Sequence, residues 1–238
     1  MTEDQPTPAA ERDLDRIADA GALIVAEAEA QLYASRGDGG SANLSKGTGY
    51  TDKYTIEDPH PREYVAHMIG TTSETSGTFI WAWGYQPGEA TGPTVVHAIR
   101  AQGEQLGIQE LAESEFVAEP RVLQRVLQAS AAISRIYTSA VFTTGGGDTG
   151  YFLIEGFELP PPRVEDLHQA IATAMAGPGR PRDIRRALHQ YAATRRIGFA
   201  EQADAAFLQA EDGMLVIGLD GNDQITGLGR QGAERPSP

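Results

Sequence analysis

Hydrophobic positions along the first half of the chain recur with a helical period and then with a strand period. From 11 to 35 apolar side chains return every three or four residues, which predicts a helix. Alternating apolar and polar positions then predict three strands, at 49–56, 63–71 and 77–85. Pro93 and Pro120 each open a further helical segment, and Gly107 lies where it can cap the first of them.

The same order of elements returns further along. Two more strands are predicted at 136–144 and 151–159, around the glycine-rich turn at 145–150. Antiparallel hairpins that alternate with helices are typical of the α+β class. We therefore expect an α+β fold in which antiparallel sheet hairpins are packed by helices.

Three consecutive prolines, Pro160 to Pro162, mark a module boundary, because they can continue neither a helix nor a sheet. Beyond them the pattern predicts helices at 163–176 and 181–197. A β-meander follows, with strands at 205–210, 214–219 and 224–228. The predicted organisation is a flexible tail, a main α+β domain, a smaller C-terminal module of two helices plus the β-meander, and a second tail, at 1–10, 11–159, 160–230 and 231–238.

The composition of the chain excludes several kinds of functional site and argues against some partners. The 238 residues contain no cysteine, which excludes disulfides, thiolate metal sites and cysteine nucleophiles. No stretch reaches the ~18 uninterrupted apolar residues of a membrane span, and the acidic first 30 residues are unlike a secretory leader. We expect a cytoplasmic protein. Its net charge of −14 argues against nucleic-acid and membrane partners.

That charge is patterned along the chain. Residues 1–30 hold eight acids against two arginines, and 101–120 and 201–223 hold acids alone, whereas 180–196 is strongly basic. The basic helix offers a partner-binding surface made of Arg182, Arg185, Arg186, Arg195 and Arg196. These arginines either dock an acidic partner or are neutralised by the chain's own acidic segments.

The most distinctive segment holds both tryptophans. Side chains alternate across a strand, so the prediction puts four aromatic residues on one face: Phe79, Trp81, Trp83 and Tyr85. This face is either packed in the core under a helix or forms the wall of a ligand groove. His67, in a strand near this face, is the fifth candidate ligand-binding residue. Its imidazole is either satisfied or exposed, or it acts as a general base.

Signatures of catalysis are missing from the sequence. The glycine-rich stretches lack the spacing of a phosphate-binding loop. The five histidines form no paired metal-ligand motif, and there is no serine nucleophile elbow. We therefore predict no catalytic residue, no metal site and no cofactor, and we favour a protein that is not an enzyme. Acid–base residues that meet only in the fold would escape this reading.

One stretch resembles a known family. The Trp81-Ala-Trp83 strand precedes a helix with Arg100-Ala-Gln-Gly-Glu104, and a later glycine-rich hairpin leads into Tyr151-Phe-Leu-Ile154. Over about residues 11–157 this order resembles a family of actinobacterial proteins of unknown function, which carry a Trp-x-Trp-Ala-Asn-like strand. Gly84 and Tyr85 stand here at the Ala-Asn step. The resemblance implies an α+β fold and a bacterial source, and it brings no catalytic residue.

Two functional hypotheses follow. The first is a non-catalytic module with an acidic surface that binds a protein or peptide partner and regulates it. The alternative is a small-molecule-binding or enzymatic α+β fold whose pocket is walled by Trp81 and Trp83. The oligomeric state is left open by the sequence.

Overall fold

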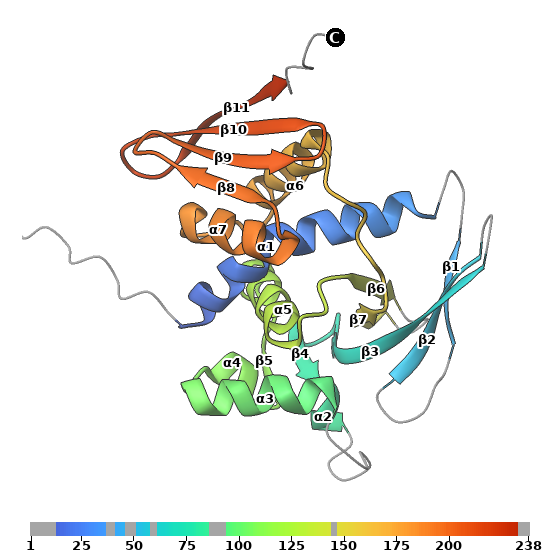
Figure 1. Ribbon diagram of the computed structural model, residues 1–238. Helices are drawn as coiled ribbons and strands as arrows, with labels where there is room; N and C mark the ends of the chain where they lie inside the picture. Colours follow the sequence, from blue (N-terminus) through green and yellow to red (C-terminus); the bar gives the residue numbers. More distant parts are fainter. Residues whose placement is uncertain are drawn as a thin grey trace, which may run out of the picture.

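The computed structural model describes residues 13–36, 41–45, 51–57, 61–85, 94–143 and 147–232 (Figure 1). The predicted tail at 1–10 and the predicted helix start at Pro93 lie outside these residues. So does the predicted C-terminal tail, apart from its first two residues, which form the end of a strand.

One long helix, α1 (Asp13–Ala34), runs through the middle of the molecule. Residues 20–26 are small or apolar on every side of the helix, which is typical of a helix enclosed by protein. It packs against three other helices: α5 (Pro120–Ser134), α6 (Val164–Ala176) and α7 (Ile184–Arg195). Gly21 lets α1 and α5 approach backbone to backbone, because a Cβ at this position would lie 2.3 Å from the carbonyl oxygen of Gln128.

The first sheet contains seven of the described strands, all paired antiparallel. They are β1 (Ala42–Ser45), β2 (Thr51–Ile56), β3 (Arg62–Thr72), β4 (Thr78–Trp81), β5 (Glu115–Val117), β6 (Ser139–Thr143) and β7 (Thr149–Glu155). The strands β1 to β5 pair in sequence order, and β7 joins both β3 and β6. The long strand β3 is therefore the hub of this sheet, and β1 and β2 extend from it to the side (Figure 1).

Three shorter helices complete this half of the molecule: α2 (Ala82–Tyr85), α3 (Val95–Leu106) and α4 (Gln109–Ala112). Ile69, Phe79 and Trp81 of the sheet meet helical residues such as Ile99 and Val126 in one buried cluster. Gly107 ends α3 in the left-handed region at φ 66°, which confirms the predicted cap.

The second sheet lies at the other end of the molecule and has the order β11-β10-β9-β8. Its strands are β8 (Gly198–Glu201), β9 (Ala205–Ala210), β10 (Gly213–Leu219) and β11 (Ile225–Gly232). The core beneath this sheet joins α6 and α7 to Leu23, Ile24 and Ala26 of α1. Helix α1 thus supplies apolar side chains to both halves of the molecule.

The α+β prediction is confirmed, and several predicted strands have different limits. The strand predicted at 136–144 begins only at Ser139, after the end of α5. The strand predicted at 77–85 ends at Trp81, whose N–H donates to the carbonyl oxygen of Ser114, and the chain then turns into α2 at Ala82. The strand predicted to reach residue 159 ends at Glu155, before Gly156 at φ 91°. The C-terminal meander gains β8, and its last strand runs on to Gly232.

Candidate functional site

Phe79, Trp81 and Trp83 of the aromatic segment belong to the buried core cluster of this half of the molecule. Phe79 and Trp81 have no exposed surface. Trp81 satisfies its indole N–H by donating to the carbonyl oxygen of Glu110 at 3.0 Å. Trp83 leaves the strand in α2, yet its ring still stacks on Trp81 with centroids 6.4 Å apart. Tyr85 ends α2, and its side chain lies outside the described part of the structure.

Trp83 is the one member of this pair close to the surface, at 8% exposure. The Arg100 guanidinium covers its ring at 4.4 Å from the centroid, which fits a cation–π contact. Glu104, one helical turn further on, accepts a hydrogen bond from the Nε of the same arginine. The Trp83 ring is therefore enclosed by Trp81 and Arg100.

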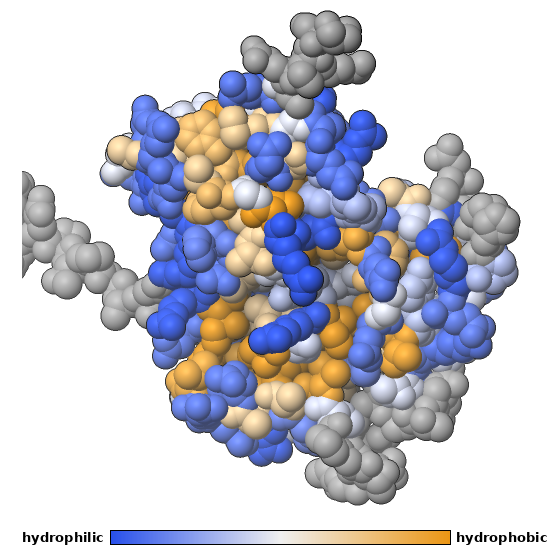
Figure 2. All heavy atoms as spheres, in the orientation of Figure 1, coloured by the Kyte–Doolittle hydropathy of each residue, from blue (hydrophilic) through white to orange (hydrophobic). Residues whose placement is uncertain are grey.

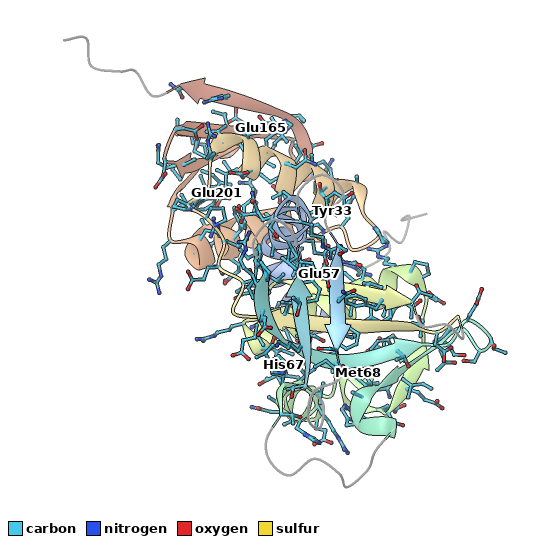
Figure 3. The ribbon with its side chains drawn as sticks, turned by 90° about the vertical axis from the view of Figure 1, so that its right-hand side faces the viewer. Tyr33, Glu57, His67, Met68, Glu165 and Glu201 are labelled. Atoms are coloured by element: carbon cyan, nitrogen blue, oxygen red, sulfur yellow. The ribbon has the colours of Figure 1, made fainter. Side chains whose placement is uncertain are left out.

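His67 does not join the aromatic cluster. Its Nε2 lies 2.7 Å from the carboxylate of Glu155 on β7, the strand next to β3. Figure 3 shows His67 low on the first sheet, on the side of the molecule where β1 to β3 lie. The imidazole thus joins two neighbouring strands.

Four of the five predicted partner-binding arginines are paired within the chain. Arg185 binds Glu201 and Asp223, Arg182 binds Asp15, Arg186 binds Asp19 and Asp183, and Arg195 binds Glu27. Arg196 is the left-handed residue that ends α7, at φ 56°. The basic helix is consequently neutralised by the chain's own acids, which was one of the two alternatives drawn from the sequence.

A buried ionic cluster, formed by Asp15, Asp19 and Arg125 and here named the Arg125 cluster, joins α1, α5 and the start of α7. Arg125 is 2% exposed and lies 2.6 Å from Asp19 and 3.2 Å from Asp15. Asp19 also accepts the backbone N–H groups of Arg182 and Asp183. Such complete pairing is what a buried carboxylate requires.

A second buried group, formed by Glu27, Tyr191 and Arg195 and here named the Glu27 cluster, lies further along α1. The Tyr191 hydroxyl donates to Glu27 at 2.9 Å, and the Arg195 Nε lies 3.0 Å from the same oxygen. Burial raises the pKa of Glu27 above its usual 4.5, although Arg195 and Tyr191 oppose the shift. Burial and the Glu27 carboxylate also raise the pKa of Tyr191. Arg195 donates in addition to the Pro160 carbonyl oxygen.

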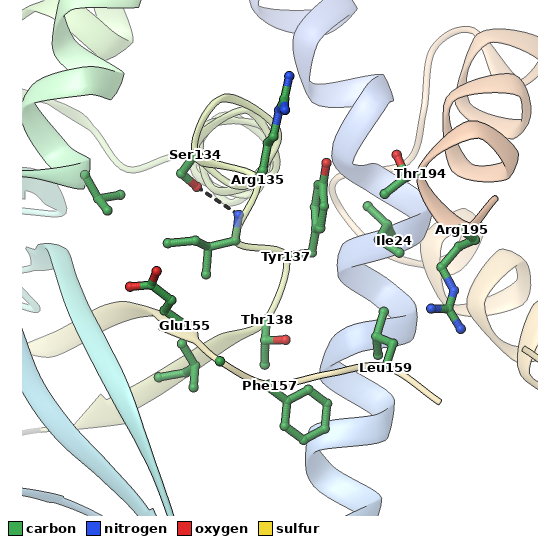
Figure 4. A pocket seen from close by; sticks show the side chains of 14 residues that line it. Ile24, Ser134, Arg135, Tyr137, Thr138, Glu155, Phe157, Leu159, Thr194 and Arg195 are labelled. Carbon is green, nitrogen blue, oxygen red and sulfur yellow. Dashed lines mark hydrogen bonds between the residues drawn. The ribbon is translucent and has the colours of Figure 1, made fainter. Parts of the chain in front are cut away.

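Two cavities open beside this cluster, where the first half of the molecule meets the C-terminal module. The first, of about 480 Å³, lies between α1, the end of α5, the end of β7 and the end of α7 (Figure 4). The second, of about 710 Å³, continues towards the end of α1. Both are lined by Gly156, Phe157 and Leu159, so they adjoin along this segment, and we name them together the seam trough.

The lining of the seam trough mixes apolar, uncharged polar and charged groups. Figure 4 shows the apolar Ile24, Phe157 and Leu159 among the hydroxyl-bearing Tyr137 and Thr138 and the charged Arg135, Glu155 and Arg195. Figure 2 shows the middle of the molecule hollowed beside α1, with hydrophilic and apolar residues side by side.

Of the residues of this site, sequence reasoning named only Arg195, as part of the basic helix. One signal was available: residues 20–26 predict a helix buried on all sides, so the acids Asp19 and Glu27 on either side of that run need partners. Their partners come from residues more than a hundred positions away, Arg125 and Arg195, and no spacing indicates them.

Within the described ranges no three acidic or histidine side chains converge as they would around a metal ion. The described helices include none that is long and apolar enough to cross a membrane.

Comparison with known proteins gives a family and no activity. No curated protein and no solved structure matches the chain. A family of unknown function (DUF6882) matches residues 15–157, which is more than half of the chain and takes in α1 and the whole first sheet. The match ends within the segment that lines the seam trough. The chain therefore belongs to the DUF6882 family of unknown function.

Proposed function

We propose that the chain is a non-catalytic protein-binding module, whose partner lays a short extended segment in the seam trough. One observation carries the proposal: the two cavities follow α1 in series, with Ile24 lining the first and Gln31, Ala34 and Ser35 lining the second. An elongated trough fits a chain segment better than it fits a compact metabolite.

The length of the trough supports this choice. From Ile24 to Ser35, α1 advances about 16 Å at 1.5 Å per residue. An extended chain rises about 3.3 Å per residue, so roughly five residues fit along this distance. Peptide-binding grooves commonly hold segments of this kind, with main-chain hydrogen bonds for affinity and side-chain pockets for specificity.

The chemistry of the lining supports it as well. Tyr64, Phe157 and Leu159 would contact apolar side chains of the segment.

 The Thr194 hydroxyl, which lines the first cavity, is placed to hydrogen-bond its backbone. The trough therefore offers both kinds of contact that an extended segment needs.

Charge favours one kind of partner. The chain carries −14 overall, and four of the five predicted partner-binding arginines, Arg182, Arg185, Arg186 and Arg195, are already paired internally. The remaining surplus is acidic, so a partner with a basic surface would be attracted and an acidic one repelled.

Site-specific photo-cross-linking in the cells that make the protein tests the proposal. A photoreactive phenylalanine analogue replaces Ala34, which lines the trough, or Tyr33, its neighbour outside the trough lining, which is 76% exposed (Figure 3). We expect one discrete adduct from position 34 and none from position 33. Equal labelling at both positions, or none at position 34, would contradict the proposal.

A further inference from the structure

The outermost strand of the second sheet has a free edge. Among the described strands β11 pairs only with β10, and Figures 1 and 3 both place it at the outer end of the molecule, far from the first sheet. It is eight residues long and contains no proline, the residue that most directly blocks strand addition. Its one charged side chain, Arg230, is held by Asp212 at 3.1 Å.

We propose that this edge pairs with the β11 of a second copy of the chain, so that two four-stranded sheets form one continuous sheet of eight strands. A two-fold axis perpendicular to the sheet at Leu228 gives an antiparallel register in which Leu228 meets its own copy. In that register Gly227 lies opposite Gly229 of the other copy, and Thr226 lies opposite Arg230. No like charges face each other across the join.

The helices leave room for this arrangement. α6 packs against β9 and β10 and makes no comparable contact with β11. Three strand spacings of about 4.8 Å separate β10 from its symmetry mate, which is roughly 14 Å. Packed helices need only 8–10 Å between their axes. The two copies of α6 therefore fit on the same face of the joined sheet.

The side chains of β11 also suit a second copy. Leu228 is opposite the buried Ile217 of β10, faces the core side and stays half-buried in one chain. At the two-fold axis its copy would cover it. Among the described residues nothing lies within 4 Å of a Cβ position at Gly227, and a Cβ at Gly229 would come no nearer than 4.0 Å to its neighbours, so this face of the strand is uncovered.

Charge substitution at the two glycines tests the join, because neither has a positive φ and both have room for a side chain. The double variant G227K/G229K places lysine opposite lysine twice, and G227E/G229E does the same with glutamate. The variant G227K/G229E replaces the same two glycines but places opposite charges across the join. It is the matched control for any loss of pairing that comes from the substitutions alone.

Sedimentation velocity over a range of protein concentrations gives the readout. We expect the unaltered chain and G227K/G229E to be dimers. The two like-charge variants should dissociate with a dissociation constant raised by about tenfold or more, and an equimolar mixture of them should form a heterodimer. A monomeric unaltered chain at all concentrations, or like-charge variants that dimerise as well as G227K/G229E, would overturn the proposal.

Discussion

Asp19 has no exposed surface, yet it carries a carboxylate that interacts with Arg125, Arg186 and two backbone N–H groups. A buried charge of this kind persists only when its partners are complete, and removing one partner costs far more than an exposed ion pair contributes. The Arg125 cluster is therefore a sensitive point of the molecule.

Replacing Arg125 with methionine should expose that sensitivity. The substitution keeps an unbranched apolar side chain but leaves Asp15 and Asp19 without their buried cation, so we expect a loss of about 3–5 kcal/mol in the free energy of unfolding. Urea denaturation measures it. Arg121→Met, at an exposed position of the same helix, is the control. Equal losses in the two variants would contradict the prediction.

Glu27 predicts a dependence of stability on pH. Its pKa is raised in the folded chain, mainly by burial, so the folded state holds this proton more tightly than the unfolded state does. The resulting stabilisation is complete below the unfolded pKa of about 4.5 and is lost as the pH rises through the folded pKa.

The substitution Glu27→Gln removes this titration. We expect the unaltered chain to lose stability relative to E27Q as the pH rises above about 4.5, because only the unaltered chain must then ionise a buried carboxyl. Urea unfolding at a series of pH values measures the difference. E165Q makes the same charge change at an exposed position of α6 and corrects for net charge. A stability difference between the unaltered chain and E27Q that does not change with pH, or that changes in the opposite direction, would refute the prediction.

At the scale of elements, the crossing of α1 and α5 depends on one missing side chain. Alanine at position 21 would raise intrinsic helix propensity by up to about 1 kcal/mol. Its Cβ would, however, lie 2.3 Å from the Gln128 carbonyl oxygen, which is backbone and cannot swing away. We expect Gly21→Ala to lower the melting temperature, with a net cost of about 1–3 kcal/mol.

Gly221→Ala is the matched control, since nothing lies within 4 Å of its Cβ position. A G21A chain as stable as G221A would show that the two helices can separate without cost.

The sequence predicted the long elements well and the short ones poorly. The apolar repeat correctly indicated α1. The prolines and glycines at helix ends correctly indicated α3, α5, α6 and α7. The strands β1, β5 and β8 have only three or four residues each, too few for an alternating pattern to stand out. In 77–85 the alternation continues through Trp83, but the strand's hydrogen bonds end at Trp81.

The candidate site could not be predicted from the sequence, for a different reason. The Glu27 cluster joins side chains more than 160 positions apart in the chain. The seam trough exists only where α1, the 156–159 segment and α7 meet. Periodicity describes which side of an element is buried, and it does not indicate which other element covers that side.

At the scale of the whole molecule, α1 belongs to the residues that match the family and is also part of the core of the C-terminal module. The organisation into domains at 11–159 and 160–230 stays a prediction, and the shared helix predicts how the two parts depend on each other. Without the module, Leu23 and Ile24 would face water, and Glu27 would lose both Tyr191 and Arg195.

Residues 1–159 produced alone should therefore aggregate or unfold without a sharp transition. Supplying residues 160–238 in trans should restore a soluble complex, because it returns the missing half of the core. Light scattering and thermal denaturation measure both outcomes. A truncated chain that is monomeric and melts as cooperatively as the full chain would contradict the dependence.

The stacked pair of Trp81 and Trp83 has a consequence for spectroscopy. The chain has two tryptophans, and both lie in the core between the first sheet and its helices, so indole emission originates from one half of the molecule alone. Far-UV circular dichroism, in contrast, records the backbone of both halves. If the two signals change together during denaturation, the halves unfold as one unit. If they separate, the emission curve identifies which half opens first, with no label added to the protein.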